Sequence, residues 1–176
     1  MSLPAPPATG NGVWIMPAAN LIHEDFLGLF LAHGFSIGNA MLFYRPAMTV
    51  DTEAHVDIIP RNPEKCVASA INIVIGGNGS TMRWYDLPTD SREIRWTRAK
   101  TPYLSWPITS LEELDRCPIG LSPILTRVDR PHAVFVGDHE RWCVSMRFSS
   151  SFGSWDSAVE RLSAAGLVCN RGASEI

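Results

Sequence analysis

Polar and apolar side chains alternate along residues 141–148 so regularly that this segment is predicted to be a β-strand with two unlike faces. One face carries the polar set Arg141, Cys143, Ser145 and Arg147, and the other carries Trp142, Val144, Met146 and Phe148. Residues 69–75 repeat the pattern, with Asn72 on the more polar side, and in residues 54–59 His55 and Asp57 share one face. Solvated faces are usually rich in Lys, Glu and Thr. The polar faces of these strands instead carry His, Asp, Asn, Ser and Arg. This composition predicts a polar site in the interior, with the apolar faces covered from outside.

The order of elements predicts a mainly β fold with flanking helices. Helices are expected from Asn20 to about Ala32 and from Ser154 to about Ala165, each with a capping residue at its start and a glycine after its end. The predicted strands are Val13–Pro17, Ala40–Arg45, Ala54–Ile59, Ser69–Ile75, Ser80–Leu87, Glu93–Arg98, Ser122–Val128, His132–Val136 and Arg141–Phe148. A short helical turn is predicted over Ser110–Arg116. This order indicates a sheet sandwich or open barrel that helices cover on one face.

Length and composition predict a single domain over residues 13–176, after a flexible segment at residues 1–12 that does not resemble a secretory signal. A net charge of −3 without a basic run argues against a nucleic-acid-binding module. No apolar stretch approaches the roughly 20 residues that span a bilayer, so no membrane partner is expected. Four widely spaced cysteines, interpreted as reduced and mostly buried thiols, favour a cytoplasmic location.

A candidate metal site combines His55 and Asp57 with a later histidine, His132. Residues i and i+2 of a strand lie on the same side, roughly 6–7 Å apart, so the first two can reach one ion. His132 begins a separate predicted strand. Two imidazoles and one carboxylate form the ligand set of non-heme iron(II) oxygenases. A lone His-x-Asp is more often a structural hydrogen bond, so the prediction depends on the three side chains converging.

The other histidines fit a metal site less well. His139 is the best rival to His132, but it falls in a predicted turn, which positions a ligand less firmly than a strand. His23 and His33 lie on or beside the first helix and are interpreted as surface or structural residues.

The sequence resembles the Fe(II)- and 2-oxoglutarate-dependent dioxygenases, in particular their prolyl-hydroxylase-like branch. The resemblance rests on His55-Val56-Asp57 and on residues 132–145, where Arg141 follows His132 by nine residues and Ser145 follows four later. It implies a double-stranded β-helix (a jelly-roll or cupin-like barrel) with helices packed on its major sheet. It implies that His55, Asp57 and His132 ligate Fe(II) and that Arg141 pairs with the far carboxylate of 2-oxoglutarate. It also implies dioxygen as co-substrate, release of succinate and CO2, and ascorbate as a possible reductant.

Other residues have weaker assignments. Asn72 is a candidate hydrogen-bonding partner of the co-substrate, although a buried asparagine satisfied by backbone groups is at least as common. Arg147 shares the face of Arg141 and is either a substrate ligand, a rival co-substrate anchor or part of a rim salt bridge. Trp84 and Tyr85 either line a substrate pocket or pack in the core.

Two other functional classes remain open from the sequence. One is a cupin-like metal- or ligand-binding protein without oxygenase activity, and the other is a structural protein with an accidental triad. The prime substrate, a small molecule or a peptidyl residue, is not specified.

Overall fold

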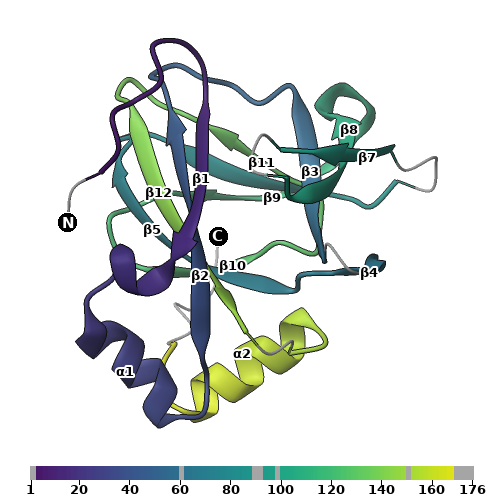
Figure 1. The fold of residues 1–176 in the computed structure, drawn as a ribbon. Helices are drawn as coiled ribbons and strands as arrows, with labels where there is room; N and C mark the ends of the chain where they lie inside the picture. The colour runs from purple at the N-terminus through teal and green to yellow at the C-terminus, as the bar shows by residue number, and fades with distance from the viewer. Residues whose placement is uncertain (1–2, 60–61, 89–92, 98–99, 150–151, 169–176) are drawn as a thin grey trace.

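The computed structural model describes residues 3–59, 62–88, 93–97, 100–149 and 152–168. The chain is mainly β and forms two antiparallel sheets (Figure 1). This confirms the predicted mainly β class with flanking helices.

The first sheet contains five strands, in which segments from both ends of the chain lie side by side. In spatial order they are β1 (Gly12–Pro17), β2 (Ile37–Arg45), β12 (Arg141–Phe148), β5 (Ser69–Gly76) and β10 (Ile124–Arg127). Strand β12 pairs with β2 on one side and with β5 on the other. The strand with the most regular alternation is therefore central in the sheet.

The second sheet contains seven strands and includes the predicted histidine strands. Its order is β7 (Glu93–Trp96), β8 (Pro102–Pro107), β3 (Glu53–Ile59), β11 (His132–Phe135), β6 (Thr81–Tyr85) and β9 (Glu113–Pro118), with β4 (Asn62–Cys66) paired to β3. Strands β3 and β11 are neighbours, and His55 and His132 are directly opposite each other in the register.

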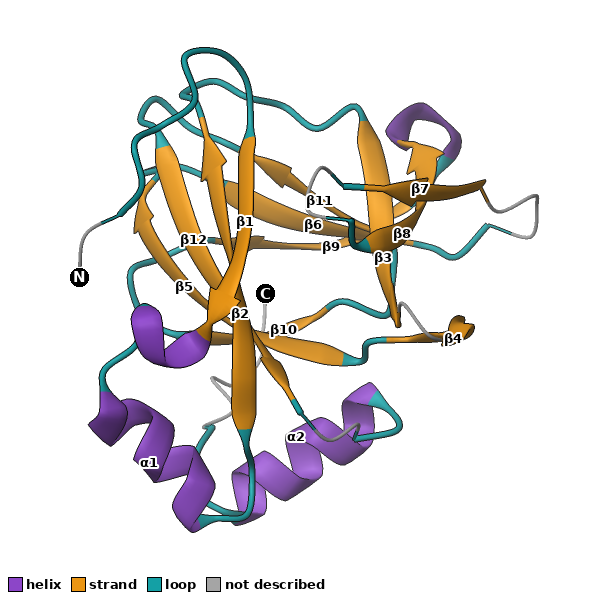
Figure 2. Ribbon diagram, viewed as in Figure 1, coloured by secondary structure: helices purple, strands orange, loops and turns teal. Residues whose placement is uncertain are grey.

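Both helices cover the apolar face of the five-stranded sheet (Figure 2). They are α1 (Glu24–Ala32) and α2 (Trp155–Ala164). Phe30 of α1 and Leu162 of α2 join a buried cluster with Leu42, Val144 and Met146. Because successive side chains of a strand point to opposite faces, this packing leaves Arg141, Cys143, Ser145 and Arg147 facing the second sheet.

A smaller apolar cluster joins the two sheets. Val74 and Cys143 of the first sheet pack against Met82 and Val134 of the second, together with Val136 and Ile119. The indole Nε1 of Trp84 also donates a hydrogen bond of 2.9 Å across the gap to the carbonyl of Arg127. The interior between the sheets is therefore partly apolar and partly lined by the polar faces.

Three details differ from the sequence predictions. The predicted helical turn at Ser110–Arg116 is wrong, because this segment contains the end of a 3-10 helix (Ile108–Ser110) and then strand β9, which pairs with β6. Helix α1 begins at Glu24 and not after Asn20, because a separate 3-10 turn (Ala18–Asn20) precedes it and His23 caps it. Strands β4 and β8 were not predicted.

The cysteines follow the prediction in part. Cys143 is buried and Cys117 is exposed, and both are free thiols. The side chains of Cys66 and Cys169 lie outside the described residues. Within the described part of the chain, no helix combines the length and apolar character needed to cross a membrane.

Candidate metal centre

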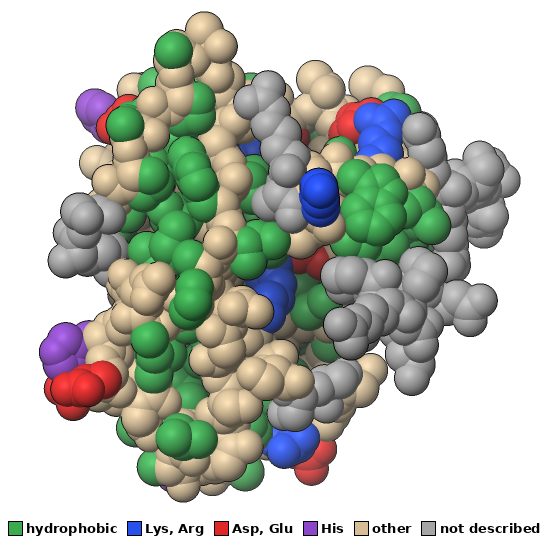
Figure 3. All heavy atoms as spheres, viewed as in Figure 1, with side chains coloured by type: hydrophobic (Ala, Val, Ile, Leu, Met, Phe, Trp, Pro, Cys, Tyr) green, Lys and Arg blue, Asp and Glu red, His purple; other side chains and the backbone are tan. Residues whose placement is uncertain are grey.

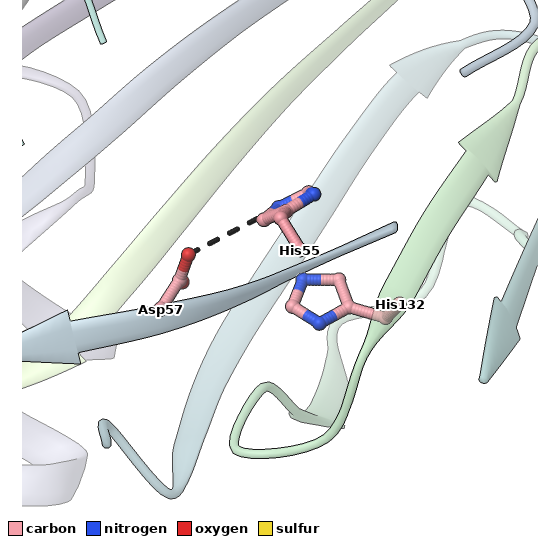
Figure 4. Close-up of side chains that lie close together, drawn as sticks. All are labelled: His55, Asp57 and His132. Carbon is pink, nitrogen blue, oxygen red and sulfur yellow. Dashed lines mark ion pairs between the residues drawn. The ribbon is translucent and has the colours of Figure 1, made fainter. Parts of the chain in front are cut away.

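His55, Asp57 and His132 converge between the two sheets, as the sequence predicted (Figure 4). One potential ligand atom from each residue lies within 4.8 Å of those from the other two. His55 and Asp57 come from the same face of β3, and His132 comes from the start of the neighbouring β11. The imidazole centroids of the two histidines are 4.3 Å apart.

The protonation states of the triad suit a cation. Burial lowers the pKa of His132 to about 3, with a further contribution from His55, and burial also lowers the pKa of His55. Burial alone raises the pKa of Asp57, but Arg147, His55 and His132 outweigh it, so that its pKa is lowered overall. At neutral pH the site therefore presents two neutral imidazoles and one carboxylate, which is the form in which these groups bind metals.

The hydrogen bond of His132 fixes its tautomer. Its Nδ1 lies 2.8 Å from the carbonyl oxygen of Arg130. A carbonyl oxygen can only accept, so Nδ1 carries the proton and donates it. The lone pair of Nε2 is then available to a metal, an arrangement that is common for metal-binding histidines.

Asp57 is held by an arginine from the opposite sheet. The guanidinium of Arg147 on β12 contacts Oδ2 of Asp57, while Oδ1 lies 4.0 Å from Nε2 of His55. One carboxylate oxygen is thus fixed by the arginine and the other is directed toward the histidines. The chemistry of the triad fits a divalent transition metal, because two imidazoles provide borderline nitrogen ligands and one carboxylate provides an anionic oxygen ligand. Three protein ligands leave further coordination positions open.

A small cavity of about 60 Å³ lies next to the triad. Three of its lining residues are arginines, Arg45, Arg141 and Arg147, whereas Asp57 is the one carboxylate among its described lining residues. Arg147 is paired with Asp57, and Arg45 forms an ion pair with Asp51. The positive charge that is left over comes from Arg141.

Arg141 is buried without an acidic partner. Arg141 is only 4% exposed. Within the described chain no carboxylate forms an ion pair with its guanidinium, and its Nε lacks a hydrogen-bond partner. A buried guanidinium is costly unless it is paired. The geometry therefore leaves this corner of the cavity suited to an anion that the chain itself does not provide.

Ser145 and Asn72 line the same cavity. The hydroxyl of Ser145 accepts a 2.6 Å hydrogen bond from Arg147, so its own proton remains available for donation. The amide of Asn72 is paired with the hydroxyl of Thr126 at 3.0 Å, and its other end has no partner within the described residues. The sequence alternative of a fully satisfied asparagine therefore does not apply in this structure.

A second, larger cavity of about 760 Å³ meets the triad from the other side. It shares Phe43, Arg45, His55, Asp57 and Arg147 with the small cavity, so these five residues lie between the two spaces, whereas His132 lines only the small cavity. Tyr103 and Ser105 of β8 line it, opposite Asp57 and His55 in the register. Sequence reasoning missed Arg45, Asp51, Tyr103 and Ser105. The alternation of residues 102–106 was the available signal for the two residues of β8.

The remaining sequence candidates lie in different places. Trp84 is opposite His132 in the register, but it packs in the cluster between the sheets and does not line either cavity. Tyr85 points to the other face of β6, where it is buried with Ala54 and Ala133, so its assignment to a substrate pocket is not supported. His139 is exposed in the turn before β12, and His23 and His33 are exposed beside α1.

Comparisons with known proteins give little further information. No protein-family model and no curated protein matches the chain. Among solved structures, an X-ray structure of E. coli ycfD is similar over 93% of this chain, with 12% sequence identity and a TM-score of 0.40. This chain covers 41% of the length of that protein.

Proposed function

We propose that the protein is an Fe(II)- and 2-oxoglutarate-dependent oxygenase, most simply a hydroxylase, built on a double-stranded β-helix. Two facing antiparallel sheets with helices on the outside of one of them are compatible with that fold. The observation that carries the functional proposal is the buried Arg141, which has no acidic partner among the described residues and lines the same small cavity as the His55/Asp57/His132 triad.

The cavity fits an end of a short dicarboxylic acid in charge. Its three arginines face one carboxylate, and a bound divalent ion would add further positive charge. A volume of about 60 Å³ holds roughly four or five water molecules, about half the non-hydrogen atoms of 2-oxoglutarate, so the acid would extend beyond this cavity toward the metal. One carboxylate of 2-oxoglutarate would pair with Arg141, while its 2-oxo acid end faces the triad. The planar guanidinium suits such a pairing because it can donate two parallel hydrogen bonds.

Ser145 and Asn72 support the same ligand. The hydroxyl proton of Ser145 can be donated to the carboxylate that Arg141 holds. Because the hydroxyl of Thr126 can either donate or accept, the amide of Asn72 can turn its NH2 group toward the cavity without losing that hydrogen bond. Both side chains thus add neutral donors for an anion.

The chain's own contribution to catalysis would be orientation and exclusion of water. Fe(II) supplies the redox chemistry toward dioxygen and the 2-oxo acid. In the overall reaction one oxygen atom enters a substrate C–H bond, and the other enters succinate as CO2 is released. Arg147 keeps Asp57 ionised and oriented, and the carbonyl of Arg130 keeps His132 in the required tautomer. The small cavity would hold the co-substrate and the large one the substrate, with His55 and Asp57 lining both.

The test is binding of 2-oxoglutarate to iron(II)-loaded protein without oxygen, measured by calorimetry. Arg141→Ala is expected to weaken this binding about 10–100-fold, because a hydrogen bond to a charged group contributes roughly 1.5–3 kcal/mol, while iron affinity stays nearly unchanged. Arg116→Ala, at an exposed arginine outside the site, is the matched control and is expected to change neither affinity.

Succinate formation from 2-oxoglutarate with iron(II) and ascorbate is the accompanying activity assay. Iron binding without measurable 2-oxoglutarate binding would reject the oxygenase and leave the cupin-like metal-binding protein. An equal loss of affinity for iron(II) and for 2-oxoglutarate in Arg141→Ala would reject the assignment of Arg141 as the residue that binds the co-substrate.

A further inference from the structure

The larger cavity is the place from which a substrate would reach the triad, and its chemistry restricts what that substrate can be. It opens beside His55 and Asp57 and measures about 760 Å³, within the 300–1,000 Å³ of typical small-molecule sites. Figure 3 shows basic and acidic side chains inside a hollow near the middle of this face, with hydrophobic side chains around it.

Apolar side chains from the five-stranded sheet line one side of this cavity. Ile15 of β1 is paired in register with Met41 of β2, and Phe43 follows on the same face of β2. Met41 is opposite Ser145, so the apolar surface continues directly from the face that carries the co-substrate residues. Ile15 is 43% exposed even though it is large and apolar, which leaves its side chain available to a ligand.

The charged side chains that line the described part of the cavity are already paired with groups of opposite charge. Arg147 is paired with Asp57, Arg45 with Asp51, and Glu53 accepts from both Arg95 and Ser105. A charged substrate group would have to compete for these side chains, and taking one partner from the largely buried Arg147–Asp57 or Arg45–Asp51 pair is costly. This differs from the small cavity, where no described residue is an acidic partner of Arg141.

On this basis, and resting on the proposed oxygenase function, we propose that the prime substrate is an uncharged, mainly apolar small molecule that binds against Ile15, Met41 and Phe43. An acidic substrate held by Arg147, which the sequence left open, is excluded by this proposal because Arg147 is engaged with Asp57. Tyr103, whose ring packs edge-on against His55 at 5.9 Å between centroids, would contact the substrate on the side of the triad.

The test compares two fluorescent probes with the same aromatic skeleton. N-phenyl-1-naphthylamine is uncharged, whereas 8-anilino-1-naphthalenesulfonate carries a sulfonate. We expect the uncharged probe to bind at least about tenfold more tightly to the full-length protein. Ile15→Glu is expected to weaken binding of the uncharged probe about tenfold or more, since it places a charge within the apolar lining of the cavity. Leu121→Glu, at a leucine that is 70% exposed and outside both cavities, should leave binding unchanged.

A second measurement places the probe relative to the triad. Mn(II) bound at the triad should broaden the proton NMR signals of the uncharged probe, and His55→Ala, which removes a metal ligand, should abolish the broadening. Circular dichroism of each variant checks that it is folded, and Ile15→Trp, which reduces the cavity volume without adding charge, serves as a second cavity variant. It is expected to weaken probe binding as well.

Equal or tighter binding of the sulfonate probe would overturn the proposal, as would unchanged binding of the uncharged probe in both Ile15 variants. Neither assay needs 2-oxoglutarate. Failure of co-substrate binding would therefore reject the oxygenase, whereas failure of the probe experiment with co-substrate binding intact would reject only the substrate class.

Discussion

Three arginines around the triad differ in what they contact, although their side chains are chemically identical. Arg147 holds Asp57, Arg45 holds Asp51, and Arg141 has no acidic partner within the described chain. The sequence distinguished Arg141 from Arg147 only through the spacing to His132. Burial and pairing provide an independent distinction, since an anion that binds at Arg141 displaces no existing ion pair.

Arg147 is predicted to support metal binding through Asp57. Replacing Arg147 with Ala removes the contact that holds Oδ2, so the carboxylate loses its fixed orientation. Loss of such a partner of a ligand typically costs 10–100-fold in metal affinity, and we expect a reduction of about that size in a titration with Fe(II) or Mn(II). Arg147→Lys should recover part of the affinity. Unchanged affinity in Arg147→Ala would show that Asp57 is positioned without the arginine.

At the scale of elements, the turn between β5 and β6 positions Arg141. The backbone N–H of Gly77 donates to the carbonyl of Glu140, and a Cβ built on Gly77 would lie 2.9 Å from Cβ of Arg141 and 3.0 Å from its Cγ. Gly77 also has a positive φ of 67°. The glycine-rich segment 76–79 is thus a turn that connects β5 of the five-stranded sheet to β6 of the other sheet, and not a β-hairpin, since β5 and β6 do not pair; it also allows the close approach of the arginine strand.

Gly77→Ala and Gly79→Ala form a matched pair for this turn. Both positions have a positive φ, but a Cβ on Gly79 meets nothing within 4 Å. We expect both variants to lose about 1–2 kcal/mol of unfolding free energy through the left-handed backbone, measured by urea denaturation. Only Gly77→Ala should also displace Arg141 and weaken 2-oxoglutarate binding severalfold. Equal co-substrate affinity in the two variants would show that the close approach is not needed.

The elements that the sequence missed are those in which tertiary pairing outweighs local pattern. The charged segment 110–116 favours a helical turn by composition, yet residues 113–118 pair with β6, and Glu113 forms ion pairs with Arg83 and Arg116. Strand β8 is short and begins and ends at proline, but it is held between β3 and β7. The conformation of such short segments is decided by the distant strands with which they pair, and the local sequence carries no information about those strands.

For the whole molecule, burial of the two uncharged histidines of the triad makes folding sensitive to acid. Since the pKa of His132 is lowered from 6.5 to about 3 in the folded protein, the unfolded chain binds more protons between these values. The free energy of unfolding therefore falls as the pH is lowered through this window. The lowered pKa of His55 acts in the same direction.

We predict that the metal-free protein loses stability progressively as the pH falls below about 6.5, the ordinary histidine pKa, as measured by urea denaturation at a series of pH values. His132→Gln should show a weaker dependence over the same range, and His33→Ala, at an exposed histidine, should follow the unaltered protein. The same dependence in His132→Gln would show that other groups control the acid sensitivity.

The sequence by itself determined the local chemistry: which residues alternate along a strand, that His55 and Asp57 share a face, and that the apolar reverse of residues 141–148 needs a cover. Only the tertiary structure decided that β3 and β11 are neighbours and that Arg147 reaches Asp57 from the opposite sheet. It also decided that Arg141 is buried with no acidic partner among the residues that the structure describes. The reason is physical. Side-chain periodicity follows from the geometry of a single strand, whereas the pairing of charges and the shape of a cavity depend on strands that are far apart in the chain.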